Sequence, residues 1–291
     1  MYYDHDDPVL LDAICKELVQ KKFSGNLVLA SDYEIYGYVT AKRTPIDERA
    51  MPNPESDRGK RAMAEEELVK TYLKNAPFGI VILRFSLIFG PYMTANVLSD
   101  IMQQALLNQD IQIWQPGSRC FDFVYVTDAV RAIQQVFQLH PDPGGLAIYN
   151  IGSGYEVKIA NVARDIRHLV NSESVIIYKP VDELPANKGY HNQLDVKKAS
   201  DRLGWDPWTE TQKGFLQTVW WMQKALPQDQ TAVGAPDILK TFPQLRDDFG
   251  KTKLGSTEML VSNEAFEKQF HIAAERARKD QRSPEQVEAE C

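Results

Sequence analysis

Apolar residues recur along this chain in two alternating patterns. Residues 9–22 carry apolar side chains at positions 10, 11, 14, 15, 18 and 19, which is the spacing of a helix with one buried face. Short, nearly continuous apolar runs such as Leu-Val-Leu-Ala are typical of strands that are buried on both faces. The expected helices are 9–22, 57–74, 95–107, 129–139, 157–170, 195–203 and 209–225, and the expected strands are 27–30, 80–85, 111–114, 121–126, 147–151 and 175–178.

This alternation predicts an α/β fold in which a parallel sheet is covered by helices on both faces. No internal repeat interrupts the pattern. After residue 226 the chain becomes polar and loses its strand-like runs, and only a short amphipathic helix starting at Ser262 is expected there. The sequence therefore predicts one α/β domain over 1–226 and a polar extension, helical or disordered, over 227–291.

Composition excludes several classes of protein. The net charge is -7 and the sequence pI is about 5.4, which argues against a nucleic-acid partner because such proteins usually present a basic face. No apolar run reaches the ~20 residues of a membrane span, and the acidic start MYYDHDDPVL does not resemble a signal peptide. A cytoplasmic location with no membrane partner is expected.

The three cysteines, Cys15, Cys120 and Cys291, are widely spaced and odd in number. That spacing indicates neither a disulfide framework nor a metal site, and it favours two reduced thiols in the core. His5 and its acidic neighbours are interpreted as a solvated terminus. No metal is predicted.

Four segments taken in order, LVLASDYEIYG, VILRFSLIFGP, FDFVYVTDAVRAI and YNIGSGYEV, resemble the extended short-chain dehydrogenase/reductase family of NAD-dependent nucleotide-sugar epimerases and dehydratases. The closing segment LDVKKASDRLGWDPW is also similar to that family, so the resemblance covers residues 9–226. It implies a Rossmann-like sheet, NAD(P) as cofactor, a nucleotide-sugar substrate and a small C-terminal substrate lobe. It also implies a Tyr-x-x-x-Lys pair that moves a proton while hydride passes to the cofactor.

The chain departs from the family first at its amino-terminal end. The resemblance implies a strand, a glycine-rich turn and a helix that hold the cofactor's pyrophosphate. The chain instead starts at a helix that the family places later, and its only Gly-x-Gly, at Gly152 and Gly154, is interpreted as a turn. We therefore expect an incomplete sheet, doubtful cofactor binding by this chain alone, and an exposed sheet edge that a second copy or another protein would cover.

The second departure concerns the catalytic pair. No tyrosine occurs between Tyr38 and Tyr72, and the two plausible registers put either Arg58 and Ala62 or Ser56 and Lys60 at the family's Tyr and Lys positions. The simplest interpretation is a plain helix packed on the sheet. The candidates for residual acid/base chemistry are Asp32, Glu34 and Lys60.

The third departure concerns the substrate site. The resemblance implies two arginines on a diphosphate, but the corresponding residues are Phe121 and Asn192, with Arg119 close by as a substitute. Asn96, Tyr125 and Asp195 match family positions. The predicted substrate-binding residues are Asn96, Arg119, Tyr125 and Asp195.

Three hypotheses follow. The chain is part of an epimerase/dehydratase, a non-catalytic descendant that keeps the scaffold for binding or regulation, or a cofactor-independent enzyme that uses Asp32 or Glu34. The missing tyrosine favours a protein without the family's usual redox catalysis in this chain alone.

Overall fold

The computed structural model describes residues 8–93, 95–114, 119–139, 143–179 and 191–225. The predicted extension 227–291 lies outside these residues. The described residues form two compact units, one comprising 8–93, 113–114, 119–139, 143–162, 178–179 and 191–218, and the other 95–112, 163–177 and 219–225. The predicted single domain over 1–226 stays a prediction. No helix in the described ranges is long and apolar enough to cross a membrane.

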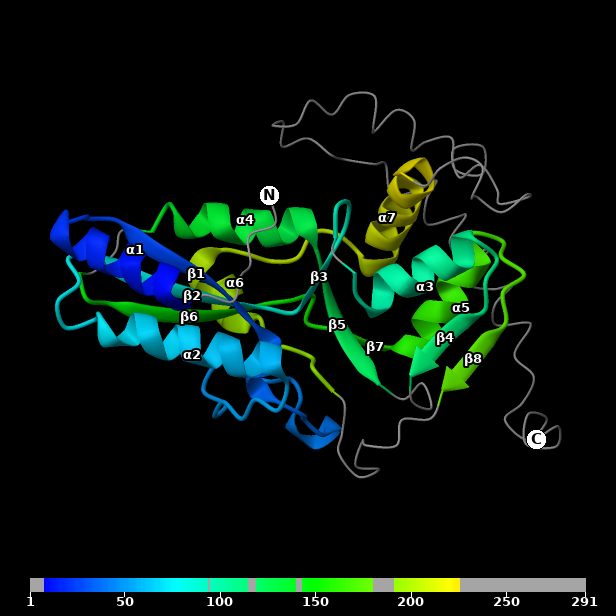
Figure 1. Ribbon diagram of the computed structural model, residues 1–291, viewed down its shortest axis with the longest axis horizontal. Helices are drawn as coiled ribbons and strands as arrows, with labels where there is room; N and C mark the ends of the chain where they lie inside the picture. The colour runs from blue at the N-terminus through cyan, green and yellow to red at the C-terminus, as the bar shows by residue number, and fades with distance from the viewer. Residues whose placement is uncertain (1–7, 94, 115–118, 140–142, 180–190, 226–291) are drawn as a thin grey trace. The chain divides into compact units, whose positions relative to one another are not determined.

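The first unit contains a parallel sheet of three strands in the order β1-β2-β6. The strands are β1 (Asn26–Asp32), β2 (Gly79–Phe85) and β6 (Leu146–Ile151), and Figure 1 shows them side by side. Every residue of β2 is buried, because it lies between two strands and beneath helices on both faces. Its apolar run, interrupted only by the buried Arg84, is therefore explained by burial on both faces, as the sequence predicted.

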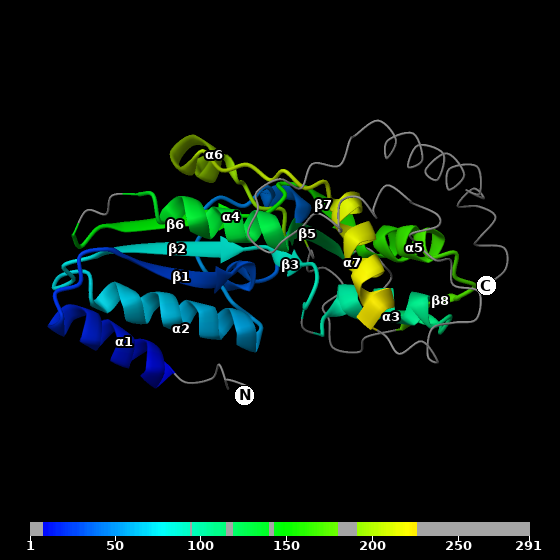
Figure 2. The ribbon, with the colours of Figure 1, turned by 90° about the horizontal axis from the view of Figure 1, so that it is seen from above.

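Helices cover both faces of this sheet, as expected (Figure 2). α1 (Pro8–Gln20) and α2 (Asp57–Thr71) pack on one face, where Ile80 and Ile82 of β2 point. α4 (Val126–Val136) and α6 (Lys197–Leu203) pack on the other, against Val81 and Leu83. The period of two along β2 thus divides the core into two layers.

A second sheet of the same unit has the order β3-β5-β7 and corrects two predictions. It consists of β3 (Leu87–Phe89), β5 (Cys120–Tyr125) and β7 (Glu156–Lys158). The sequence predicted one strand over 80–85 and missed β3, because the apolar run continues past Ser86 while the backbone changes sheets there. It also predicted a helix from 157, whereas β7 pairs antiparallel with β5 and the helix starts at Ile159.

The remaining elements are short turns and the parts of the second unit. Two 3-10 helices, η1 (Tyr33–Tyr36) and η2 (Ala41–Arg43), follow β1. α3 (Val97–Leu106) belongs to the second unit, and α5 (Ile159–Leu169), α7 (Thr211–Ala225), β4 (Ile111–Trp114) and β8 (Ile176–Lys179) are each divided between the units, with β4 paired to β8.

Candidate functional site

A pocket of about 60 Å³ lies in the first unit, next to the turn that follows β1. It lies between η1, the loop before α2, the start of β5 and the residues around 191. Its lining residues are Tyr33, Glu34, Gly37, Tyr38, Glu55, Ser56, Arg119, Cys120, Phe121, His191 and Asn192. The fold therefore brings the predicted residues Glu34 and Arg119 to one place, although 85 positions separate them in the sequence.

Arg119 is held beside the pocket by an aromatic side chain. Its guanidinium carbon lies 5.0 Å from the centroid of the Phe121 ring, which is a cation–π distance. Asn192 lines the same pocket, and its side-chain oxygen accepts a hydrogen bond of 2.6 Å from the backbone N–H of Asp122. The two positions at which the resemblance implied arginines, now Phe121 and Asn192, thus meet around Arg119.

The acidic residues that line the pocket are Glu34 of η1 and Glu55 of the loop before α2, whereas Asp32, at the end of β1, is not among the lining residues. Glu34 accepts a short hydrogen bond from the Ser56 hydroxyl, and its other oxygen lies 3.7 Å from the guanidinium of Arg58. Asp32 caps η1 by accepting from the Glu34 backbone N–H at 2.8 Å, and it lies 3.6 Å from Arg58. Burial raises the pKa of Asp32 to about 6, so this carboxyl changes charge near neutral pH.

The beginning of α2 contains the residues that stand at the family's catalytic pair in either register. Ser56 caps the helix by accepting from the Gly59 N–H at 3.0 Å. Arg58 reaches toward Asp32 and Ala62 is buried, so both lie on the sheet side of the helix. Lys60 has a side chain that is 61% exposed and lies 3.7 Å from Asp57. The candidate Lys60 does not line the pocket, whereas Ser56 does, and the choice between the two registers stays a prediction.

Of the other predicted substrate residues, Tyr125 and Asp195 do not line this pocket, and Asn96 belongs to the second unit. Asn96 caps α3 in the second unit by accepting from the backbone N–H groups of Leu98 and Ser99. Tyr125 is buried against the Phe89 ring at a centroid distance of 5.4 Å, and burial raises its pKa. Asp195 accepts from the Lys197 N–H at 2.9 Å at the start of α6. These contacts give each of the three a local structural task.

Sequence reasoning missed several residues of the pocket. Tyr33 hydrogen-bonds the Asn192 side chain, and burial raises its pKa, so its phenol stays protonated. His191 and Cys120 also line the pocket, and the Nδ1 atom of His191 lies 2.5 Å from a carboxylate oxygen of Glu156. No local motif links Tyr33, Cys120 and His191, because they come from η1, β5 and a separate segment.

A buried carboxylate fastens the loops behind the pocket. Asp122 of β5 accepts four hydrogen bonds, two from Ser153 and one each from the N–H groups of Gly154 and Leu194. A Cβ on Gly152 would lie 2.8 Å from the Asp122 carboxylate, so this position requires glycine. The turn at Gly152 and Gly154, which the sequence analysis interpreted only as a turn, therefore packs around the Asp122 carboxylate and donates hydrogen bonds to it.

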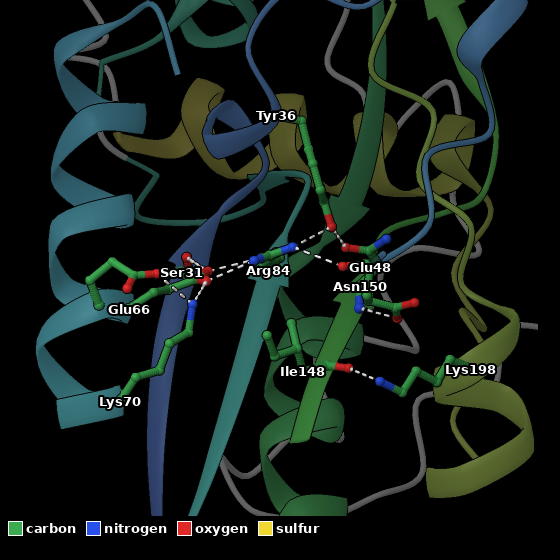
Figure 3. Close-up of polar contacts among 10 residues, drawn as sticks. Ser31, Tyr36, Glu48, Glu66, Lys70, Arg84, Ile148, Asn150 and Lys198 are labelled. Carbon is green, nitrogen blue, oxygen red and sulfur yellow. Dashed lines mark hydrogen bonds and ion pairs between the residues drawn. The ribbon is translucent and has the colours of Figure 1, made fainter. Parts of the chain in front are cut away.

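A second buried network holds η1 against the sheet (Figure 3). Arg84 of β2 donates to both oxygens of Glu66 on α2 at 2.9 and 2.7 Å, and Ser31 donates to Glu66 at 2.7 Å. Arg84 also donates to the Tyr36 hydroxyl at 2.9 Å, which in turn donates to Asn150 at 2.7 Å. Because Tyr36 ends η1, this network fixes the turn that carries Tyr33 and Glu34.

Comparison with known proteins identifies the family. The model of the NAD dependent epimerase/dehydratase family matches residues 9–152. A putative UDP-glucose 4-epimerase of Methanocaldococcus jannaschii is 32% identical over 228 residues, which are 76% of this chain and 70% of that protein. The chain belongs to the NAD-dependent epimerase/dehydratase family. It is also 28% identical to dTDP-D-glucose 4,6-dehydratase of Bos taurus over 81% of this chain, a match that spans 64% of the bovine protein.

Solved structures of this family share the fold. The MoeE5 structure in complex with UDP-glucose and NAD has a TM-score of 0.68 at 23% identity and covers 75% of this chain and 71% of that one. The UDP-glucose 4-epimerase of Thermotoga maritima, solved with UDP-glucose, has a TM-score of 0.65 at 22% identity and covers 75% and 69%. The expected Rossmann-like fold is thereby confirmed.

The described residues do not fit the pyrophosphate of the family's cofactor NAD. Such a group is normally held by backbone N–H groups at a glycine turn before a helix. At the carboxyl end of β1 the Glu34 backbone N–H already donates to the Asp32 carboxylate at 2.8 Å. After β6, the N–H groups of Ser153 and Gly154 already donate to Asp122.

Proposed function

We propose that the Arg119 pocket binds the phosphate-bearing part of a nucleotide-sugar-like molecule and that this chain alone does not perform the family's tyrosine-dependent redox reaction. The observation that carries the proposal is the pocket itself, in which Arg119 lies with Asn192 and Tyr33. Arg119 supplies a fixed cation, and Asn192 and Tyr33 supply neutral polar groups. A guanidinium and neutral donors are the groups that recognise a diphosphate.

The proposed loss of redox chemistry rests on α2. An arginine side chain does not serve as a general acid or base near neutral pH, and an alanine at position 62 has no polar group to lower the pKa of a neighbour. A sugar hydroxyl next to this helix therefore meets no phenol–amine pair.

Isothermal titration of the full chain with UDP-glucose and with UDP-glucuronic acid tests the binding proposal. We expect Arg119→Ala to weaken binding roughly 10- to 100-fold, because a charge-assisted bond contributes about 1.5–3 kcal/mol. Arg49→Ala is the matched control, since the Arg49 side chain is 91% exposed, pairs with Asp47 and lies outside the pocket. Absent binding, or equal affinity of the wild type and Arg119→Ala, would refute the proposal.

A second assay tests the redox part separately. The chain is mixed with NAD and UDP-glucose, and NADH fluorescence and sugar isomers are followed. We expect no turnover. Sustained epimerisation or NADH formation would show that another residue replaces the tyrosine, and it would leave the binding proposal intact.

One observation favours the cofactor-independent alternative. Asp32, with its pKa raised to about 6, lies next to Glu34 at the pocket end of β1, which are the conditions for a general acid or base. Solvent-deuterium exchange into bound UDP-glucose, followed by NMR, tests it. Exchange that is abolished in Asp32→Asn would support this alternative, and a wild type without exchange would exclude it for that sugar.

We expect a protein partner or a second copy of this chain to cover the exposed edge of the sheet. β1 pairs with β2 and, within the described residues, with no other strand. A strand edge of this kind attracts another strand. Light scattering of the purified chain tests whether it forms an oligomer. The cytoplasmic location likewise stays a prediction.

A further inference from the structure

Three side chains that can bind metal ions meet at the junction of β5 and β7. Glu156 is directly opposite Asp122 in this antiparallel ladder, and Cys120 lies two residues before Asp122, so Cys120 and Glu156 are on the same face. His191 reaches this face from a separate segment, whose backbone N–H donates to Val39 at 3.0 Å. One ligand atom from each of Cys120, Glu156 and His191 lies within 4.8 Å of the others.

We propose that Cys120, Glu156 and His191 form a binding site for a divalent metal ion of the zinc class. A thiolate, a carboxylate and a neutral imidazole are the ligand types that Zn²⁺ takes in proteins. The thiolate and the carboxylate together carry two negative charges, which balance a divalent cation. Zn²⁺ accepts this mixed set because it is a borderline-soft ion that binds sulfur, nitrogen and oxygen ligands.

An unsatisfied atom of one of the three side chains is a second observation in support of this site. The Oε2 atom of Glu156 is buried and has no hydrogen-bond partner, while Oε1 contacts Nδ1 of His191 at 2.5 Å. A buried carboxylate oxygen without a partner is costly, and such atoms are rare in folded proteins. A cation bound at Oε2 removes that cost. On binding, the Cys120 thiol releases its proton to solvent and its sulfur forms the bond to the metal.

The site is open toward the pocket. Cys120 and His191 both line the cavity that contains Arg119 and Asn192. Three protein ligands with a fourth position facing a cavity are the arrangement of zinc sites that bind water or a ligand oxygen, whereas structural zinc sites use four protein ligands. The opposing interpretation is a His191–Glu156 ion pair beside a buried thiol, which predicts no metal binding.

Cobalt(II) spectroscopy of the full chain tests the proposal directly. The background variant combines Cys15→Ala, Cys291→Ser and His5→Gln, which removes the other thiols and the amino-terminal histidine. Addition of Co²⁺ should produce a thiolate-to-cobalt charge-transfer band with a stoichiometry of one ion per chain. Cys120→Ser in this background should abolish the band.

Zinc titration measures the other two ligands. His191→Gln and Glu156→Gln should each weaken Zn²⁺ binding at least ~10-fold, and His168→Gln, on α5, is the control and should not. Zn²⁺ should also raise the Tm of the background variant. Circular dichroism of each variant shows that it is folded, and Cys120→Ala replaces Cys120→Ser if the latter fails to fold. A background variant without a cobalt band, or Zn²⁺ affinity unchanged in His191→Gln, would overturn the proposal.

Discussion

Two arginine–carboxylate contacts across α2 differ in distance and burial. Arg84 and Glu66 are almost fully buried and approach to 2.7 Å, whereas Arg58 is 56% exposed and stays 3.6 Å from Asp32. At Glu66, burial opposes ionisation, but the bonds and charge of Arg84 outweigh it and lower the pKa. At Asp32, burial dominates and raises the pKa to about 6.

The difference in pairing distinguishes a carboxylate that stabilises the fold from a carboxyl that can titrate. The Arg84–Glu66 pair forms a closed network that joins β1, β2, η1 and β6, so it serves stability. Asp32 keeps a carboxyl that can change its charge beside Glu34, which lines the pocket. In a buried region, the quality of the pairing decides whether an acid is a permanent anion or a titrating group.

The largest expected effect comes from breaking the closed network. Glu66→Ala leaves the Arg84 guanidinium buried without its anion, so we expect a loss of about 3–5 kcal/mol in the free energy of unfolding. Urea unfolding measures it. Glu67→Ala, whose carboxylate is 62% exposed beside Lys70, is the control and should change stability by less than about 0.5 kcal/mol. Similar losses in both variants would contradict the framework role.

Asp122 tests whether neutral donors can hold a buried carboxylate as firmly as an arginine does. Asp122→Asn replaces one acceptor oxygen by an NH₂ group that faces the N–H donors of Ser153, Gly154 and Leu194. We expect a loss of about 2–3 kcal/mol in urea unfolding. Asp201→Asn, which changes an exposed partner of Lys197, is the matched control. A loss below about 1 kcal/mol, which is close to the error of the extrapolation, would mean that the turn rearranges.

Asp32 predicts a pH dependence with a definite sign. Its pKa rises from 3.8 in the unfolded chain to about 6, so its contribution to stability is fully present below the unfolded value and is lost as pH rises through about 6. Relative to Asp32→Asn, which keeps a capping oxygen, the wild type should lose about 1–2 kcal/mol between pH 4 and pH 7. Urea unfolding across that range measures it. If the difference in unfolding free energy between the wild type and Asp32→Asn stays constant over this pH range, Asp32 behaves as an ordinary surface carboxyl.

The smallest effects are expected at the exposed start of α2. Arg58→Ala should cost less than about 1 kcal/mol in the unfolding free energy, since its ion pairs are long and solvated. Lys60→Ala should cost less than about 0.5 kcal/mol and leave UDP-glucose binding unchanged. Calorimetry of both variants checks this. A binding defect in Lys60→Ala would restore Lys60 as a site residue.

The prediction of the fold followed from local patterns. The apolar run of β2 and the spacing of α1 and α2 predicted a parallel sheet with two covered faces, because burial on both faces demands such a run and one-sided burial demands a helical period. β7 was missed because three residues are too few to show a strand period. Its pairing with β5 depends on contacts that only the folded chain makes.

The sequence by itself determined the family, the layered α/β fold and the absence of a Tyr-x-x-x-Lys pair from the α2 segment, since these depend on residue type and local spacing. Only the tertiary structure decided which polar residues meet. It brought Arg119 to Asn192 and Glu156 to His191, pairs that lie 73 and 35 positions apart, and it left Lys60 in solvent. A polar site depends on distances between side chains on different elements, and a periodic pattern within one element does not contain those distances.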